Sequence, residues 1–478
     1  MEITARLFIL DFNLIMKKIY YIFVCVVLLI FICPGMFTNT KSNQKSAIDN
    51  RMLAEFPTDC QNDWNEAVEN YLEDRVGFRN MFITGYQISM DKLFHIFARA
   101  GYSYGRNGEI YSVEDSATYQ HRDVEDEYIT LLTDYLVGTQ SICDELGASL
   151  YFFVAPNKET ILYEDYPLGY NVHHQPNRTD RIYSALNDAG IKTIDVRYDF
   201  LEMEEKRKLF NVKYDPAHWN GFGHYSAMNI INAVISQEYS ELDNLSMELF
   251  DVSTKTEQYF NESFFPIHEE VPTFSLKQDD TVQDNSLFEY TSPLNYALHW
   301  NNPKGRNLPK IMFIGDSYLG TGFGTEICFK TRCSEFTRIH IQNIADIPFY
   351  ISYYKPDIVV IEAVERVFGE KSFWSSAKLQ SGFNPHGKSI MNTYSIEDMG
   401  MMKWSVIMGT ETNRNITILE GEIPDGTNRI EVVVCEYKGE LFYAKVDKST
   451  GGYCFAFPFS GISADEIKFD IYYSDSNT

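Results

Sequence analysis

Two short segments of this chain together contain the three residue types of a serine acyl-transfer site. The first is Asp-Pro-Ala-His-Trp over 215–219, and the second is Gly-Asp-Ser-Tyr over 315–318. With this spacing the aspartate can accept a hydrogen bond from one imidazole nitrogen while the other nitrogen faces the serine hydroxyl. The carboxylate then fixes the histidine tautomer and supports the imidazolium when the histidine takes the serine proton. Asp215, His218 and Ser317 are therefore the candidate catalytic residues.

Each segment alone also has an ordinary structural explanation. Gly-Asp-Ser is a common turn sequence, and a histidine beside a tryptophan is often a packed core residue. The catalytic interpretation is favoured because both segments occur in one chain and in suitable settings. Ser317 follows the apolar run 310–314, so its hydroxyl is expected on the turn that leaves a buried strand. Open α/β sheets bind and react at the carboxyl ends of their strands.

Apolar runs alternate with amphipathic stretches through the middle of the chain. The predicted strands are 148–154, 191–196, 310–314, 337–341 and 357–361, and the predicted helices are 127–146, 180–189 and 221–235. Such alternation predicts a parallel sheet with helices on both faces, which is a three-layer α/β/α domain. Segment 242–304 interrupts it with acidic, loop-rich and aromatic sequence, and we expect an insertion near the mouth of the site.

The two motifs resemble those of SGNH hydrolases, but in most of these the serine segment comes first. The reversed order, with Trp219 directly after the histidine, resembles the permuted SGNH domains of the alginate O-acetyltransferases AlgJ and AlgX and of the related DHHW proteins. The Asp-x-x-His spacing is that of ordinary SGNH enzymes, whereas AlgJ and AlgX usually have Asp-x-His-Trp. Other segments that resemble the family are 50–57, 71–79, 104–108, 154–158 and 355–366.

The resemblance implies an O-acyltransferase, and in particular an O-acetyltransferase, that uses no cofactor. The acyl group would pass through Ser317 onto hydroxyls of a cell-surface or secreted polysaccharide. A membrane-bound, multispanning O-acyltransferase is the implied partner that delivers the acyl group. The same triad would also serve a carbohydrate acetyl esterase, because only acceptor binding and water exclusion differ. A non-catalytic glycan-binding component of polysaccharide export is the third interpretation.

Four further residues are candidates for oxyanion or substrate binding. The amide of Ser317 is expected to donate to the oxyanion, with Asn343 as the second donor and Tyr318 beside it. Arg366 and Lys158 lie at predicted strand ends, where they could hold an acidic sugar or orient the acceptor. Structural ion pairing, with Glu362 or Glu365 as the partner, is the alternative for these two cations.

The N-terminus contains a segment with the length of a membrane span. Lys17 and Lys18 precede the apolar run 19–37, which is long enough to cross a bilayer. The lysines favour a cytoplasmic N-terminus, and no small-residue cleavage site follows closely, so we predict a retained anchor. Residues 1–45 are then a cytoplasmic tail, transmembrane anchor and stalk, and the catalytic part lies outside the cytoplasm. Helices are predicted over 63–71 and 78–98.

The C-terminal residues have a different character. Short strand-like runs with turn signals between them occur at 417–420, 429–434, 440–446, 453–457 and 466–472. They predict a small β-sandwich over 384–478 that follows a catalytic domain over 46–383. A carbohydrate-binding module occupies this place in AlgX, so the resemblance implies glycan binding. Trp404, Tyr437, Tyr443 and Tyr453 could stack on sugars, although rings in a sandwich also form its core.

Composition excludes several functions. The chain has 478 residues, of which 44% are hydrophobic, and can bury a large core. Its formal net charge of −26 would repel the phosphates of nucleic acid. No cysteine and histidine spacing resembles a zinc site, and His173-His174 lies in a polar loop, so no metal is predicted. Cys328 with Cys333, and Cys435 with Cys454, could form disulfides or remain free thiols.

Overall fold

The structure is a computed structural model that describes residues 16–28, 37–46, 52–58, 63–98, 101–113, 125–169, 177–259, 267–291, 297–368, 374–375, 379, 390–394, 402–408, 415–422, 430–447, 452–463 and 466–473. The chain divides into two compact units. One comprises residues 1–103 and 257–269, and the other comprises residues 104–256 and 270–478. The second unit contains both motifs that the sequence singles out.

A seven-stranded sheet with the order β4-β3-β11-β9-β10-β8-β7 forms the centre of the second unit. Five neighbouring strands in it are parallel, as predicted, and lie close to the predicted runs. They are β3 (Ser149–Ala155), β4 (Lys192–Ile194), β9 (Ile311–Gly315), β10 (Glu335–His340) and β11 (Ile358–Val364). Every residue of β9 and β11 is buried, because a parallel sheet is covered on both faces.

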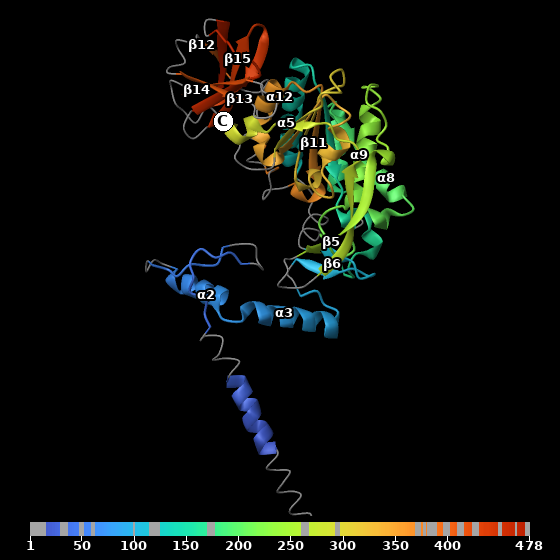
Figure 1. Cartoon of the computed structure of the whole chain (residues 1–478), viewed down its shortest axis with the longest axis vertical. Coiled ribbons are helices and arrows are strands. Elements are labelled where there is room, and N and C mark those ends of the chain that lie inside the picture. The colour runs from blue at the N-terminus through green and yellow to red at the C-terminus, as the bar shows by residue number, and fades with distance from the viewer. Residues whose placement is uncertain are drawn as a thin grey trace, which may run out of the picture. The chain divides into compact units, whose positions relative to one another are not determined.

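Helices cover the two faces of this sheet, and Figure 1 shows β11 between α5 and α9. The three predicted helices are α5 (Asp126–Glu145), α7 (Arg178–Asp188) and α9 (Gly221–Ile235), and shorter ones are α6 (Lys158–Ile161), α8 (Val196–Glu202), α10 (Ser286–Thr291), α11 (Thr325–Phe329) and α12 (Ile347–Tyr354). Successive side chains of a strand point to opposite faces. Phe152 of β3 accordingly packs in one core with Leu132 of α5, while Phe153 packs in the other with Ile231 of α9. The predicted three-layer α/β/α arrangement is confirmed.

The segment 242–304 contains more regular structure than the sequence predicted. It includes β5 (Phe250–Tyr259) and β6 (Ile267–Leu276), which form a two-stranded sheet, and also β7 (Val282–Gln283) and β8 (Leu298–Asn301). β8 pairs antiparallel with β10, and β7 pairs antiparallel with β8. The prediction of a parallel sheet is therefore confirmed for five strands and wrong at this edge, where the pairing is antiparallel. Strands as short as β7 and β8 have too few residues to show a periodic pattern.

The C-terminal residues form two antiparallel four-stranded sheets, with the orders β12-β19-β15-β16 and β13-β14-β18-β17. The strands are β12 (Ile390–Tyr394), β13 (Met402–Met408), β14 (Asn415–Glu422), β15 (Ile430–Tyr437), β16 (Glu440–Tyr443), β17 (Lys445–Asp447), β18 (Gly452–Phe457) and β19 (Ile467–Tyr473). Side chains from both sheets, including Phe442, Phe455 and Phe469, share one buried core. The predicted β-sandwich is thus present.

Three of the four aromatic residues proposed to stack on sugars are buried. Tyr437, Tyr443 and Tyr453 are each 3% exposed, whereas Trp404 is 38% exposed on β13. Of the two alternatives for these rings, the tyrosines follow the core one, because they pack inside the structure and cannot stack on a sugar. Trp404 alone keeps a ring that solvent can reach.

The cysteines in the described part of the chain are free thiols, including the four for which two disulfides were considered. Cys435 lies in the sandwich core, while Cys454 belongs to the opposite sheet and packs against the α/β core. The two side chains therefore point away from one another. A disulfide needs Cβ atoms that face each other.

The first unit contains α2 (Trp64–Arg75) and α3 (Arg79–Ser89), followed by a π-helical turn over Met90–Phe94. Both helices lie where the sequence predicted them. Residues 16–28 are helical, and residues 29–36 of the predicted anchor lie outside the described part of the chain. Among the residues that are described, no helix has both the length and the apolar character that crossing a membrane requires. The strands β1 (Tyr102–Tyr104) and β2 (Ile110–Ser112) follow in the chain.

Candidate active site

The serine motif forms the turn that leaves β9. Gly315 is the last residue of the strand, and Ser317 begins a 3₁₀ turn that runs to Leu319. The Asp316 carboxylate caps this turn, because its Oδ1 accepts a hydrogen bond of 2.9 Å from the amide of Tyr318. Ser317 is exposed while the residues on both sides of it are buried. The hydroxyl is thus presented at the carboxyl edge of the sheet, as predicted.

The histidine motif lies directly against the serine. Nδ1 of His218 lies 2.8 Å and 2.9 Å from the two carboxylate oxygens of Asp215, and Nε2 lies 2.8 Å from Oγ of Ser317. A carboxylate only accepts, so Nδ1 carries the proton and Nε2 is the nitrogen that can receive the serine proton. Asp215 has a φ of 42°, a left-handed conformation that is uncommon for residues other than glycine and recurs at functional sites.

The two turns are joined by a second layer of contacts. The Trp219 indole donates a 3.2 Å hydrogen bond to the Tyr318 carbonyl, and the two rings are 4.9 Å apart. The Tyr318 hydroxyl donates to the carbonyl of Ala217, the residue just before the histidine. Arg366 donates from Nη1 to the same carbonyl at 2.9 Å and to the Tyr318 hydroxyl at 3.2 Å. These contacts hold the histidine turn against the serine turn.

Comparison with protein families identifies the domain. A family model described as SGNH hydrolase-like domain, acetyltransferase AlgX, matches residues 105–345. This chain belongs to the AlgX family. The match includes Asp215, His218 and Ser317, and it confirms the resemblance that the motif order indicated.

Solved structures similar to this AlgX-family chain include three proteins. Bacillus cereus PatB1 is 12% identical with a TM-score of 0.43, and the match covers 56% of this chain and 96% of PatB1. The O-acetyltransferase domain of Pseudomonas putida AlgJ is 13% identical with a TM-score of 0.39, covering 56% and 92%. Pseudomonas aeruginosa AlgX is 10% identical with a TM-score of 0.41, covering 78% and 94%. No curated protein matches the chain.

Tyr318 does not have the geometry of an oxyanion donor in this AlgX-family site. Its side chain is fully buried and its hydroxyl is already bonded to Ala217 and Arg366. Burial raises the pKa of this phenol far above its ordinary value, so it remains protonated. Tyr318 therefore supports the site from within, and the prediction that it binds substrate was wrong.

Lys158 is also placed away from any ligand. The residue is 1% exposed, and its ammonium donates to the carbonyls of Ile110 and Asn211 at 3.1 Å and 2.7 Å. It also lies 4.8 Å above the ring of Tyr111. The prediction of acceptor binding by Lys158 was wrong, because its ammonium is buried and donates to backbone carbonyls in the interior.

Arg366 is held by hydrogen bonds rather than by an ion pair. Besides its contacts with Ala217 and Tyr318, Nη1 donates to Oδ1 of Asn157 at 3.1 Å. Within the part of the chain that the structure describes, Arg366 forms no ion pair with Glu362 or Glu365. The alternative prediction of a structural ion pair was therefore wrong for Arg366. Glu365 instead accepts from the amide of Asn157 at 2.8 Å.

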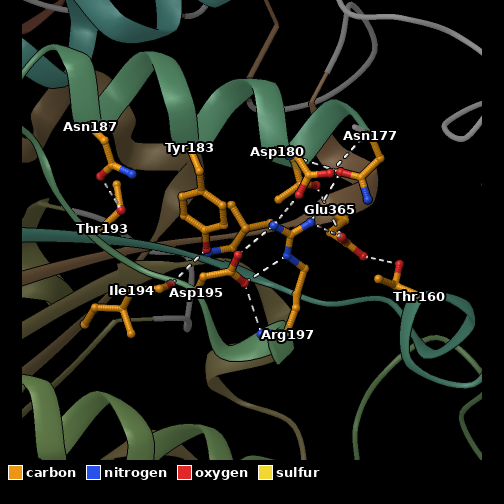
Figure 2. Close-up of polar contacts among 12 residues, drawn as sticks. Thr160, Asn177, Asp180, Tyr183, Asn187, Thr193, Ile194, Asp195, Arg197 and Glu365 are labelled. Atoms are coloured by element: carbon orange, nitrogen blue, oxygen red, sulfur yellow. Dashed lines mark hydrogen bonds and ion pairs between the residues drawn. The ribbon is translucent and has the colours of Figure 1, made fainter. Parts of the chain in front are cut away.

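A polar network also holds the turn that follows β11. Figure 2 shows Glu365 beside Thr160 and Arg197. Arg197 lies 4.0 Å from Glu365 and forms shorter ion pairs with Asp180 at 2.8 Å and Asp195 at 2.6 Å. This network joins α7 and α8 to the strand end that carries Arg366.

Asn343 lies at the correct edge of the sheet. It is in a 3₁₀ turn over Ile341–Asp346, just past β10, where His340 is opposite Gly315 of β9. Its side chain makes no hydrogen bond to the rest of the described chain, and its role as the second oxyanion donor stays a prediction. Within the described residues no cluster of three or more metal-ligating side chains occurs.

Sequence reasoning missed two buried groups beside the serine turn. His224 on α9 binds the Thr321 carbonyl and lies 3.1 Å from the Thr325 hydroxyl, and its burial lowers its pKa to about 4. Glu362 was considered only as an ion-pair partner, yet it accepts a 2.8 Å hydrogen bond from the amide of Asp316. An acidic residue within the apolar run Ile-Val-Val-Ile-Glu-Ala-Val over 358–364 was the available signal.

Proposed function

We propose that this protein is an extracytoplasmic O-acyltransferase that forms an acyl-enzyme on Ser317 and passes the acyl group to polysaccharide hydroxyls. The observation that carries the proposal is the continuous chain of contacts from Asp215 through His218 to an exposed Ser317 hydroxyl. Membership of a family of acetyltransferase domains supports acetyl as the group transferred.

In the first half-reaction, Nε2 of His218 takes the proton from Oγ of Ser317 as the oxygen attacks the donor carbonyl. Asp215 stabilises the imidazolium that results. The tetrahedral intermediate then collapses, the bond to the leaving group breaks, and His218 returns the proton to that group. The serine ester remains as the acyl-enzyme.

The second half-reaction reverses these steps with a sugar. His218 removes the proton from an acceptor hydroxyl, whose oxygen attacks the serine ester and releases Oγ, which regains the proton. In both halves the developing oxyanion would accept from the Ser317 amide and from Asn343. The acyl group thus passes from the donor to Ser317 and then to the sugar, and no cofactor takes part.

The proposal includes a setting at the membrane. The apolar run 19–37 behind Lys17 and Lys18 supports a single-pass anchor with the enzyme outside the cytoplasm. A separate membrane-bound O-acyltransferase would then supply the acyl group, because one span cannot conduct it. The C-terminal sandwich, with Trp404 exposed, would bind the polysaccharide.

A carbohydrate acetyl esterase is the second candidate. The exposure of Ser317 favours it, because water that reaches the acyl-enzyme can compete with a sugar hydroxyl.

One experiment separates these functions. The purified full chain in detergent is incubated with 4-nitrophenyl acetate, with and without oligomannuronate or chito-oligosaccharide, and nitrophenol release and sugar mass are both measured. A transferase releases nitrophenol and raises the mass of the sugar by about 42 Da for each acetyl group added. An esterase releases nitrophenol without changing the sugar. Release no faster than by Ser317→Ala would leave only a non-catalytic glycan-binding role.

A further inference from the structure

Glu362 is buried directly under the serine turn. It lies on β11, the strand beside β9, and the residue is 0% exposed. A methyl group placed on Gly315 would come within 2.4 Å of its Oε2. The carboxyl therefore occupies the space that the missing side chain of Gly315 leaves free.

Two carboxyl groups hold the main chain around Ser317. Oε2 of Glu362 accepts from the amide of Asp316 at 2.8 Å. The Asp316 carboxylate, 7% exposed, accepts from the amides of Tyr318 and Val364, each at 2.9 Å. Both oxygens of Asp316 are thus used as acceptors, whereas Oε1 of Glu362 is buried and makes no hydrogen bond within the described chain.

The charges around Glu362 do not neutralise it. Asp316, on the serine turn, is a second acid against it, and Arg366, beyond the end of the same strand, is the nearby cation. The guanidinium of Arg366 donates instead to Asn157, Ala217 and Tyr318. No residue of β3, the other neighbouring strand, is charged.

One titratable residue and one charged residue of β10 also lie beside the serine turn. His340 faces Asp316, and burial lowers the pKa of its imidazole. Arg338 is bound to Glu326 and to the Leu319 carbonyl. No cation among the described residues bonds to Glu362, and burial and the neighbouring Asp316 raise the pKa of its carboxyl well above the ordinary value.

We propose that Glu362 is a positioning residue that works as an uncharged carboxylic acid beneath the nucleophile. Its oxygen fixes the Asp316 amide, and with it the orientation of the Ser317 hydroxyl and amide that follow in the chain. Because it carries no charge, it adds no repulsion as the oxyanion develops above the turn. Loss of its proton at high pH would place a second negative charge there and slow acylation. This inference rests on the proposed acyl-transfer function.

The test compares Glu362→Gln with Glu362→Ala in the full chain, and follows kcat and KM for 4-nitrophenyl acetate from pH 6 to 10. Release by Ser317→Ala is subtracted at each pH to remove spontaneous hydrolysis. Above the pH at which half of Glu362 has lost its proton, the activity of the wild type should fall about tenfold per pH unit. Glu362→Gln keeps the acceptor oxygen and cannot ionise. Its kcat should therefore stay within about threefold of the wild-type value at pH 7 and should not decrease at high pH.

Glu362→Ala should lower kcat at pH 7 by about 10- to 100-fold with little change in KM, because the Asp316 amide loses its acceptor. Circular dichroism and urea unfolding show whether each variant is folded. Glu365→Gln is the matched control, since this buried acid lies on the same strand end but bonds to Asn157. The kcat of this control should still decrease at high pH, as in the wild type.

The inference is overturned if Glu362→Gln, while folded, is as impaired as Glu362→Ala at pH 7, or if its kcat still decreases at high pH. Failure of the proposed function itself looks different. In that case wild type and Ser317→Ala release nitrophenol at equal rates at every pH, and the role of Glu362 is refuted with it.

Discussion

Arg366 offers the sharpest test of how the two turns of the site are held together. One nitrogen, Nη1, faces the Ala217 carbonyl at 2.9 Å, Oδ1 of Asn157 at 3.1 Å and the Tyr318 hydroxyl at 3.2 Å. These acceptors belong to three separate parts of the chain. Replacing the arginine with methionine keeps most of the apolar stem and removes every donor.

The expected cost follows from these bonds. Nη1 has two hydrogens for three acceptors, and each hydrogen bond from a charged donor contributes about 1.5–3 kcal/mol. Burying the guanidinium has a desolvation cost that methionine avoids. Arg366→Met should therefore lower the free energy of unfolding by about 2–4 kcal/mol. Release of the Ala217 carbonyl should misplace the histidine turn and lower kcat by about 100-fold, or about 2.7 kcal/mol of barrier.

The assay measures kcat and KM for nitrophenol release, and KM for the sugar acceptor where transfer is observed. A positioning role predicts a fall in kcat with KM nearly unchanged. Arg207→Met is the control, because this half-exposed arginine pairs with Glu109 and Asp165 and not with the triad, and it should keep the wild-type kcat. An unchanged kcat with a raised acceptor KM in Arg366→Met would refute this reasoning and show that Arg366 binds the sugar.

Three other changes follow from single contacts. Gly315→Ala should lower stability by about 1–3 kcal/mol and reduce nitrophenol release, because its methyl would lie 2.4 Å from Glu362 and 2.6 Å from Leu319. Gly85→Ala is the control, because open space surrounds this residue on α3, and it should not be destabilised. An equal loss of stability in both variants would contradict this prediction. The folded pKa of His224, about 4, is below that of the unfolded chain. The unfolded chain therefore binds the proton first, and up to about 3 kcal/mol of stability should be lost as pH falls from about 6.5 toward 4; urea midpoints for wild type and His224→Gln measure it, and parallel curves would exclude it. Lys158→Met should lower the urea midpoint, because it removes the donors to Ile110 and Asn211, yet leave acceptor KM unchanged, whereas a raised KM would restore a binding role.

The placement of the two cations shows the limit of sequence reasoning. Lys158 and Arg366 both follow predicted strands and were equivalent candidates. The structure buries Lys158 among backbone carbonyls, whereas it places Arg366 against Ala217 and Tyr318. The difference arises from which loops lie above each strand end, and no local pattern encodes that arrangement.

The sequence by itself determined the alternation of strands and helices, because side-chain period and apolar run length are local properties. It also singled out Asp215, His218 and Ser317 as candidates, since their chemistry depends on residue type and short spacing. Only the tertiary structure decided that the two motifs, 99 positions apart, meet at 2.8 Å. It alone placed the carboxyl of Glu362 beneath Gly315, because contacts between adjacent strands depend on sheet order and register, which residues distant in the chain set together.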